Sequence, residues 1–317
     1  MKKFISVKDV SSVESLVQIA AGFKAAPLKY QQAGQGKILG LLFMNPSLRT
    51  RISTQVAAKN LGMEVIVFNA DKDGWQLEFG DGAVMNGSTT EHVKEAASVL
   101  GEYVDVLGVR SFPGLADKEK DYSEYIIESF IRHSGVPVIS LESATLHPLQ
   151  SLADILTMTE LKPEGRKPKV VMTWAPHVKA LPQAVPNSFA EWINAWGQAD
   201  FVITHPEGYE LDKKFTGQAT ITHHQDDALK DADFIYVKNW SSYTDYGKIL
   251  NTDPGWMVTA EKIKVSRKAK IMHCLPVRRN LVIADEVLDG PDSEVIRQAG
   301  NRVWAAQAVL YQILKNI

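Results

Sequence analysis

The chain has 317 residues, enough for one large domain or, more commonly, two of ordinary size. Hydrophobic residues make up 45% and charged residues 23%, with 35 basic against 37 acidic side chains, so composition gives no sign of a nucleic-acid or membrane partner. The one cysteine, Cys274, excludes an internal disulfide and a cysteine-based metal cage and suits a reducing compartment. No apolar run approaches the roughly 18 residues of a membrane span, and the N-terminus is too polar for a secretory signal, so we expect a cytoplasmic protein.

In the first half of the chain, short runs rich in Val, Ile and Leu alternate with amphipathic stretches of helical length. Apolar runs occupy residues 37–43, 63–70, 104–111 and 136–142, and the helix-like stretches between them occupy residues 48–62, 90–103 and 121–135. The runs are continuously apolar, which is typical of parallel strands that are covered on both faces.

The alternation restarts after a helix-like stretch at 149–161 and a charged linker with proline and glycine at 162–169. Further apolar runs lie at 170–176, 200–206, 219–223, 233–240 and 269–276, and an amphipathic run at 301–317 closes the chain. This pattern predicts an α/β protein with two doubly wound parallel sheets in series, joined near residues 148–168.

In open α/β sheets, ligands bind beyond the carboxyl ends of the strands, so the residues just after each strand are the candidate binding residues. Ser47-Leu48-Arg49-Thr50 follows the first strong strand and should open a helix, where free N–H groups, hydroxyls and a guanidinium suit a phosphate. The alternative is a serine N-cap followed by solvated arginines. The segment lacks the glycines and lysine of a Walker loop, and no G-x-G-x-x-G follows any strand, which disfavours a nucleotide-dependent oxidoreductase.

Other polar residues follow later strands. Arg110 is either a solvated strand end or an anion ligand, and His147, with Gln150 in the next helical turn, either caps the helix or donates to a carbonyl or phosphate oxygen. Cys274 is a buried hydrophobe or part of a turn whose carbonyls accept from an amide. Arg278, in the loop that follows, suits a carboxylate.

Together and in this order, these motifs resemble the aspartate/ornithine carbamoyltransferase family along essentially the whole chain. Ser47-Leu48-Arg49-Thr50 is similar to the family's carbamoyl-phosphate signature, S-T-R-T or S-M-R-T. His147-Pro148-x-Gln150 and His273-Cys274-Leu275-Pro276 match two further landmarks, and Arg110 and Arg302 match single arginines.

The resemblance implies roles for individual residues and an assembly. It assigns catalysis to Thr50, Arg110, His147 and Cys274, and carbamoyl-phosphate binding to Ser47, Leu48, Arg49, Thr50, Trp75, Arg110, His147, Gln150, Cys274, Leu275 and Arg302. Trp75 would reach the site of a neighbouring subunit in a homotrimer with shared active sites. The implied domains are residues 1–148, joined by a C-terminal helix at about 297–317, for carbamoyl phosphate, and residues 149–296 for the acceptor. The second domain would be knotted, and neither a metal nor a cofactor is expected.

The branch of the family that the chain resembles indicates which molecule accepts the carbamoyl group. The D-x-x-x-S-M-G segment of ordinary ornithine enzymes is missing, and a proline-rich run at 181–192 resembles the branch that carbamoylates N2-acylated ornithine. That resemblance places Glu142, His177, Lys238, Arg278 and Thr90 around the N-acylornithine.

Two positions bear on the acyl group. At the position of Thr90, acetylornithine enzymes carry glutamate and succinylornithine enzymes carry proline, so this chain matches neither. At the position of Val282, acetylornithine enzymes carry a modified lysine. A glutamate would repel a succinyl carboxylate and threonine would not. We therefore expect carbamoyl transfer to the δ-amine of N2-succinyl-L-ornithine in arginine biosynthesis. N2-acetyl-L-ornithine, and more distantly ornithine, are the alternatives, and a relative that only binds carbamoyl phosphate is a further one.

Overall fold

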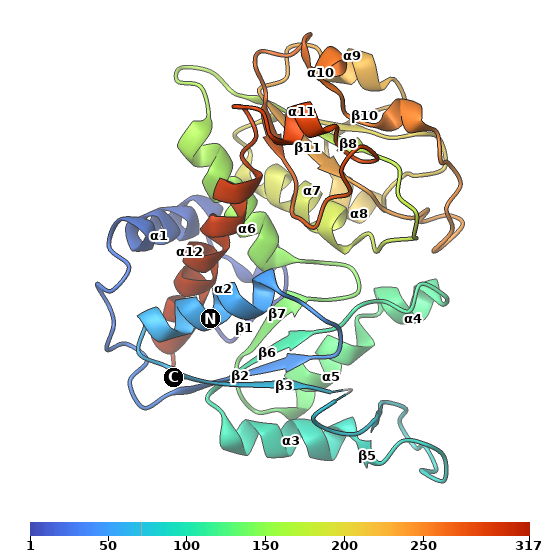
Figure 1. Cartoon of the computed structure of the whole chain (residues 1–317). Helices are drawn as coiled ribbons and strands as arrows, with labels where there is room; N and C mark the ends of the chain where they lie inside the picture. The colour runs from blue at the N-terminus through green and yellow to red at the C-terminus, as the bar shows by residue number, and fades with distance from the viewer. Residues whose placement is uncertain (71) are drawn as a thin grey trace. The chain divides into compact units, whose positions relative to one another are not determined.

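The computed structural model describes residues 1–70 and 72–317, which form two compact units (Figure 1). The first comprises Met1–Leu149 with Arg302–Ile317, and the second comprises Gln150–Asn301. The chain passes between the units within two helices, α6 (Pro148–Leu161) and α12 (Val295–Leu314). Each unit is built on a five-stranded parallel sheet, which confirms the predicted α/β class. Among the described residues, no helix has the length and apolar character that crossing a membrane requires.

The sheet of the first unit has the order β1-β7-β6-β2-β3, with every neighbouring pair parallel. Its three inner strands are almost completely buried, which explains why their sequences are continuously apolar, whereas the edge strand β3 is partly exposed. The strands are β1 (Lys3–Phe4), β2 (Ile38–Phe43), β3 (Glu64–Asn69), β6 (Val106–Arg110) and β7 (Val138–Glu142).

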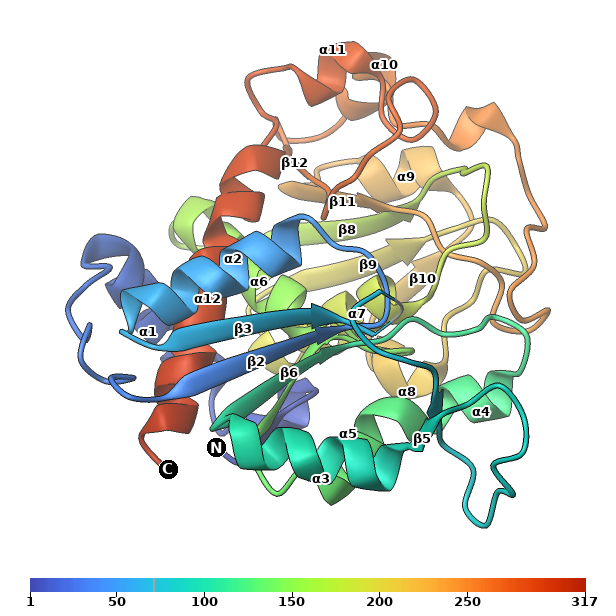
Figure 2. The same ribbon diagram turned by 60° about the horizontal axis from the view of Figure 1, so that its bottom comes forward.

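Helices cover both faces of this sheet (Figures 1 and 2). On one face, α3 and α5 pack on the strands through a cluster that includes Val93, Phe130 and Val109. On the other face, the end of α12 meets α1, where the rings of Phe23 and Tyr311 lie 5.4 Å apart. The helices of this unit are α1 (Val13–Ala25), α2 (Arg49–Asn60), α3 (Val93–Tyr103), α4 (Lys118–Tyr122), α5 (Tyr125–His133) and the 3-10 turn η1 (Val7–Asp9).

The helix expected at 90–103 begins three residues late, at Val93. Glu91 and His92 are extended instead, because β5 (Glu91–His92) pairs with β4 (Leu77–Glu78). The His92 ring then caps the helix by accepting from the Lys94 N–H at 3.2 Å.

The sheet of the second unit has the order β10-β9-β8-β11-β12, again with every neighbouring pair parallel. One face packs against α9 and α11 through apolar residues such as Val171, Ile235 and Leu288, and on the other face Phe189 of α7 stacks on Tyr236 at 4.0 Å. The strands are β8 (Lys169–Trp174), β9 (Asp200–Thr204), β10 (Thr220–Thr222), β11 (Phe234–Lys238) and β12 (Lys270–Met272). The helices are α7 (Ala184–Trp196), α8 (Lys213–Thr216), α9 (Gln225–Leu229), η2 (Pro254–Trp256), α10 (Ala260–Ile263) and α11 (Asp285–Leu288).

Candidate active site

The start of α2 is open to a ligand. Its N-cap residue is Leu48, which makes no side-chain capping bond, so the alternative of a serine N-cap is wrong. The first intrahelical bond is from the Ile52 N–H to the Leu48 carbonyl, 3.1 Å away, which leaves the N–H groups of the first turn without helical partners. These groups and the positive end of the helix dipole favour an anion in front of the turn.

Arg110 reaches this region because of an irregularity in the sheet. The β6–β7 register shifts between Val109 and Arg110, so that Arg110 pairs with Glu142 rather than with Leu141. Such a bulge changes the direction of the side chains around it. Here the Arg110 Nη1 lies 2.6 Å from the Glu142 Oε2 and 3.4 Å from the Thr50 hydroxyl.

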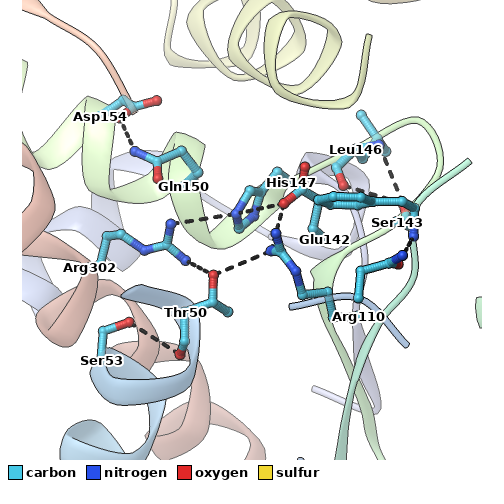
Figure 3. Close-up of polar contacts among 12 residues, drawn as sticks. Thr50, Ser53, Arg110, Glu142, Ser143, Leu146, His147, Gln150, Asp154 and Arg302 are labelled. Carbon is cyan, nitrogen blue, oxygen red and sulfur yellow. Dashed lines mark hydrogen bonds and ion pairs between the residues drawn. The ribbon is translucent and has the colours of Figure 1, made fainter. Parts of the chain in front are cut away.

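Arg302, from α12, approaches the same hydroxyl (Figure 3). Its Nη2 donates to the Thr50 Oγ1 at 2.7 Å, and its Nη1 lies 3.5 Å from the His147 Nε2. His147 stands just before α6, is 3% exposed, and has a buried Nδ1 without a partner among the described residues. Burial lowers the pKa of His147 well below 6.5, and the charges of Arg302, Arg110 and Arg49 lower it further, so the ring is neutral near pH 7.

The group around Thr50 therefore carries a net positive charge. Among the described residues, the guanidinium groups of Arg49, Arg110 and Arg302 all act on His147, and the Glu142 carboxylate pairs with Arg110. His147 is neutral, so these five side chains together carry a charge of +2. A partly buried site of this charge, with hydroxyl and backbone donors beside it, is suited to a phosphate dianion. Arg51 is not part of it, because its guanidinium stacks on Phe43 and bonds the Asn69 side chain.

The loop that leads to His147 is held by Glu124, a residue that the sequence did not predict for the site. The carboxylate of Glu124 accepts from the Ser143 hydroxyl at 2.7 Å, from the Thr145 N–H at 2.7 Å and from the Ala144 N–H at 3.2 Å. Glu124 has a positive φ of 54°, which turns the chain at the start of α5. No signal in the local sequence distinguishes this glutamate from the surface acids around it.

In the second unit, three of the predicted acceptor residues lie together. The Arg278 Nε donates to the His177 Nε2 at 3.2 Å. Burial lowers the pKa of His177, and the positive charges of Lys238, Arg278 and Lys179 add to that effect. Lys238 ends β11 and donates to the carbonyl of Asn239 at 3.0 Å. Cationic groups this close to one another suit a carboxylate ligand.

Gln150, a further predicted residue of the second unit, belongs to a buried hydrogen-bond chain that reaches the turn of Cys274 and Leu275. Gln150 donates to Asp154 at 2.8 Å, and Gln298 donates to the same Asp154 oxygen at 2.7 Å. Gln298 in turn accepts from the His273 N–H at 2.9 Å, so it orients the turn that carries Cys274. Gln298 is not predictable from the local sequence, because its role depends on a contact 144 residues away in the chain.

That turn has an unusual backbone. Leu275 has a positive φ of 56°, and the peptide bond to Pro276 is cis. A non-glycine residue with such a φ is strained, and strain of this kind clusters at binding sites. Cys274 is partly buried and forms no disulfide.

The last group of predicted residues lies at the surface of the first unit. Leu48 is 67% exposed and Trp75 is 55% exposed, while Ser47 is half-buried. The Trp75 indole donates to the Glu91 carboxylate at 2.8 Å. Thr90 is exposed, and its N–H donates to the carbonyl of Gln76 at 3.1 Å. Glu142, predicted for the acceptor, lies beside Arg110 and His147 in this same unit.

A parallel α/β unit with an anion site, followed by a second α/β unit with a cationic cluster, is the arrangement of a two-substrate group transferase. Residues 2–160 match the family model described as "Aspartate/ornithine carbamoyltransferase, carbamoyl-P binding domain", and residues 183–313 match "Aspartate/ornithine carbamoyltransferase, Asp/Orn binding domain". The chain belongs to the aspartate/ornithine carbamoyltransferase family.

The chain has relatives in the branch that the sequence indicates. The chain is 51% identical to the N-succinylornithine carbamoyltransferase of Bacteroides fragilis (strain 638R), over 100% of both chains. It is 35% identical to the N-acetylornithine carbamoyltransferase of Xanthomonas campestris pv. campestris, over 98% of this chain and 97% of the relative. A crystal structure of an N-acetyl-L-ornithine transcarbamylase variant, with one glutamate replaced by valine and with carbamyl phosphate and N-succinyl-L-norvaline bound, superimposes with a TM-score of 0.91 at 34% identity, covering 99% of this chain and 100% of that one.

Proposed function

We propose that this protein transfers the carbamoyl group of carbamoyl phosphate to the δ-amine of N2-succinyl-L-ornithine, giving N2-succinyl-L-citrulline and phosphate, in arginine biosynthesis. The observation that carries the proposal is the buried group around Thr50, with a net charge of +2 and a neutral histidine. Full-length identity of 51% to an N-succinylornithine carbamoyltransferase supports the choice of acceptor. The first unit would bind carbamoyl phosphate and the second the acylated amino acid.

The phosphate would lie in front of α2. Ser47 and Thr50 supply hydroxyls there, Leu48 and its successors supply N–H groups, and Arg49 and Arg302 supply guanidinium charge. A guanidinium binds phosphate through two parallel bonds, which fixes the orientation of the phosphate as well as its position.

The carbonyl group would be polarised by Thr50, Arg110 and His147. Negative charge develops on its oxygen as the amine attacks, and each fixed donor to that oxygen stabilises the transition state by about 3 kcal/mol. The neutral state of His147 suits this role, because an uncharged ring donates one proton without adding charge to the phosphate site. Gln150 and the carbonyls of Cys274 and Leu275 would orient the carbamoyl NH2 group.

The chemical step requires no strong protein base. A C–N bond forms between the δ-amine and the carbonyl carbon, the C–O bond to phosphate breaks, and the leaving phosphate takes the proton that the amine loses. The protein contributes mainly by holding the two reactants in register, which removes much of the entropic barrier.

Acceptor recognition would use charge. Arg278 is placed to pair with the α-carboxylate, and His177 and Lys238 add donors beside it. Glu142 is bound to Arg110, so it lies where the attacking nitrogen must arrive, and its negative charge suits the δ-amine rather than a carboxylate.

The acyl group would be selected at Thr90. The solved acetylornithine enzyme variants that bind N-succinyl-L-norvaline have a glutamate replaced by valine, serine, alanine or proline. Removal of a carboxylate is therefore compatible with a succinyl group, and Thr90 carries none. The position of the modified lysine is taken by Val282, which is 2% exposed within an apolar cluster and has no place for a charge.

We further propose a cytoplasmic homotrimer in which Trp75 completes the phosphate site of a neighbouring subunit. A tryptophan that is 55% exposed, with its indole N–H fixed by Glu91, presents an apolar surface to a partner. Sedimentation equilibrium tests the assembly, and a monomer at micromolar concentration would contradict it.

One assay tests the reaction. Citrulline-group formation is measured with carbamoyl phosphate and, in parallel, N2-succinylornithine, N2-acetylornithine and ornithine. We expect the highest kcat/KM with the succinyl substrate. A higher kcat/KM with the acetyl substrate would show that N2-acetylornithine is the acceptor and would leave the proposed reaction standing. No product with any of the three substrates would refute the proposal.

A further inference from the structure

Two histidines and a glutamate, none of them assigned to the reaction, converge at one edge of the second unit. His205 directly follows β9, His223 directly follows β10, and Glu210 lies in the loop after His205. One ligand atom from each of the three lies within 4.8 Å of the other two. The two strands are adjacent and parallel, so their carboxyl ends meet and bring the histidines together.

Each imidazole has one nitrogen occupied by the backbone. The His205 Nδ1 lies 2.8 Å from the carbonyl of Pro206, and the His223 Nδ1 lies 2.9 Å from the carbonyl of His205. A carbonyl only accepts, so both Nδ1 atoms carry the proton and both Nε2 atoms carry a free lone pair. A bond of this kind behind the ring is the usual support of a histidine that binds a metal.

The Nε2 of His205 is the strongest indication that a ligand binds here. His205 is fully buried, at 0% exposed, and this nitrogen is buried without a partner among the described residues. A buried acceptor without a donor is uncommon in folded proteins and calls for a ligand. Glu210 does not supply a donor, because a carboxylate only accepts, and its Oε1 lies 4.0 Å from the His223 Nε2.

We propose that His205, Glu210 and His223 bind a divalent transition-metal ion of the zinc class. Two imidazoles and a carboxylate suit Zn²⁺ and its neighbours, whereas Mg²⁺ and Ca²⁺ prefer sets of oxygen ligands. Tetrahedral bonds of about 2.1 Å place ligand atoms roughly 3.4 Å apart. The side chains of Glu210 and His223 are 46% and 39% exposed, so small rotations would bring their ligand atoms to that distance. The fourth position would hold water.

The ion would stabilise a segment that supports the cationic cluster. Between His205 and Glu210 lies Tyr209, whose carbonyl accepts from the Trp240 indole at 2.8 Å. The Tyr209 hydroxyl accepts from the Leu250 N–H at 2.7 Å. Binding at both ends of this loop would fix Tyr209, and with it the residues that follow Lys238.

The test uses the full-length protein after treatment with a chelator and dialysis. Zn²⁺ is titrated against a chromogenic competitor, and the unfolding temperature is measured with and without the ion. The variants are His223→Gln and Glu210→Gln. The matched control is His224→Gln. His224 is the exposed neighbour of His223, and its side chain makes no capping hydrogen bond to α9.

We expect the wild type and the control to bind one tight equivalent of Zn²⁺ and to unfold at a higher temperature with it. Each site variant should bind at least about 10-fold more weakly, since weakening a ligand's supporting hydrogen bond already has that effect, and should lose the thermal shift. Unchanged affinity in both site variants, or no binding by the wild type, would overturn the proposal.

Cobalt(II) provides a second readout that separates this site from Cys274. Bound to two imidazoles and a carboxylate, it should show visible d–d bands without a thiolate charge-transfer band, and both site variants should lose the d–d bands. A thiolate band at one equivalent would place the ion at the cysteine and overturn the proposal.

Discussion

Replacing Arg110 by methionine tests the electrophilic role of this site most directly. Methionine keeps a long apolar side chain beside the Phe112 ring, which lies 4.6 Å from the guanidinium carbon, but it removes the donors. Loss of one fixed donor to a developing oxyanion costs about 2.7–4 kcal/mol, or about 100- to 1,000-fold in kcat. We expect KM for carbamoyl phosphate to change less than kcat, because the donor acts mainly in the transition state.

The same change has a separate effect on stability. Arg110 and Glu142 lie 2.6 Å apart, with side chains only 9% and 10% exposed, and removing one member of a buried ion pair costs about 3–5 kcal/mol. The double variant Arg110→Met/Glu142→Gln removes the orphaned charge. It should recover much of the free energy of unfolding while its kcat stays low.

The assays are citrulline-group formation at saturating substrates and urea unfolding. Arg51→Met serves as the matched control, because Arg51 lies outside the charged group and contacts Phe43 and Asn69 instead. A kcat within about tenfold of wild type for Arg110→Met would refute the reasoning. So would a double variant that regains kcat together with stability, since the loss would then come from folding.

Thr90→Glu should shift the ratio of kcat/KM values from N2-succinylornithine towards N2-acetylornithine, because the new carboxylate repels the succinyl carboxylate; an unchanged ratio would remove this position from acyl selection. Glu124→Gln should lower the free energy of unfolding by about 1–3 kcal/mol and also reduce kcat, since it weakens the bonds that hold the loop before His147, whereas Glu128→Gln on the same helix should do neither. The pKa of His147 is lowered in the folded state, so below pH 6.5 the unfolded chain binds the extra proton and stability should fall as the pH drops. Urea midpoints between pH 5 and 7 measure this slope, which His147→Gln should make shallower; an identical slope would contradict the neutral buried ring.

Much of the architecture follows from the order of residues alone. Continuous apolar runs predict the buried parallel strands, such as Ile38–Phe43 and Phe234–Lys238, because both faces of such strands are covered. Site residues were found by the same logic, since ligands bind beyond the carboxyl ends of the strands. Arg110, for example, is the last residue of β6, and Lys238 is the last of β11.

The local sequence was less informative where backbone pairing competes with helix propensity. Glu91 and His92 belong to a helix-like stretch but are extended, because they pair with Leu77 and Glu78. Propensity describes only near neighbours, and a pairing partner 14 residues away outweighs it.

Linear motifs therefore predicted the chemistry of the site. They did not predict how its side chains are oriented relative to one another. Ser47–Thr50 and the residues around His147 and Cys274 indicate carbamoyl transfer because, together and in this order, they resemble the signature motifs of one family. Tertiary structure decided that Glu142 faces Arg110, through a one-residue register shift between two strands. It also decided that Gln298 supports the Cys274 turn and that His205 meets His223. These relations depend on strand register and on contacts between segments far apart in the chain, and no local pattern encodes them.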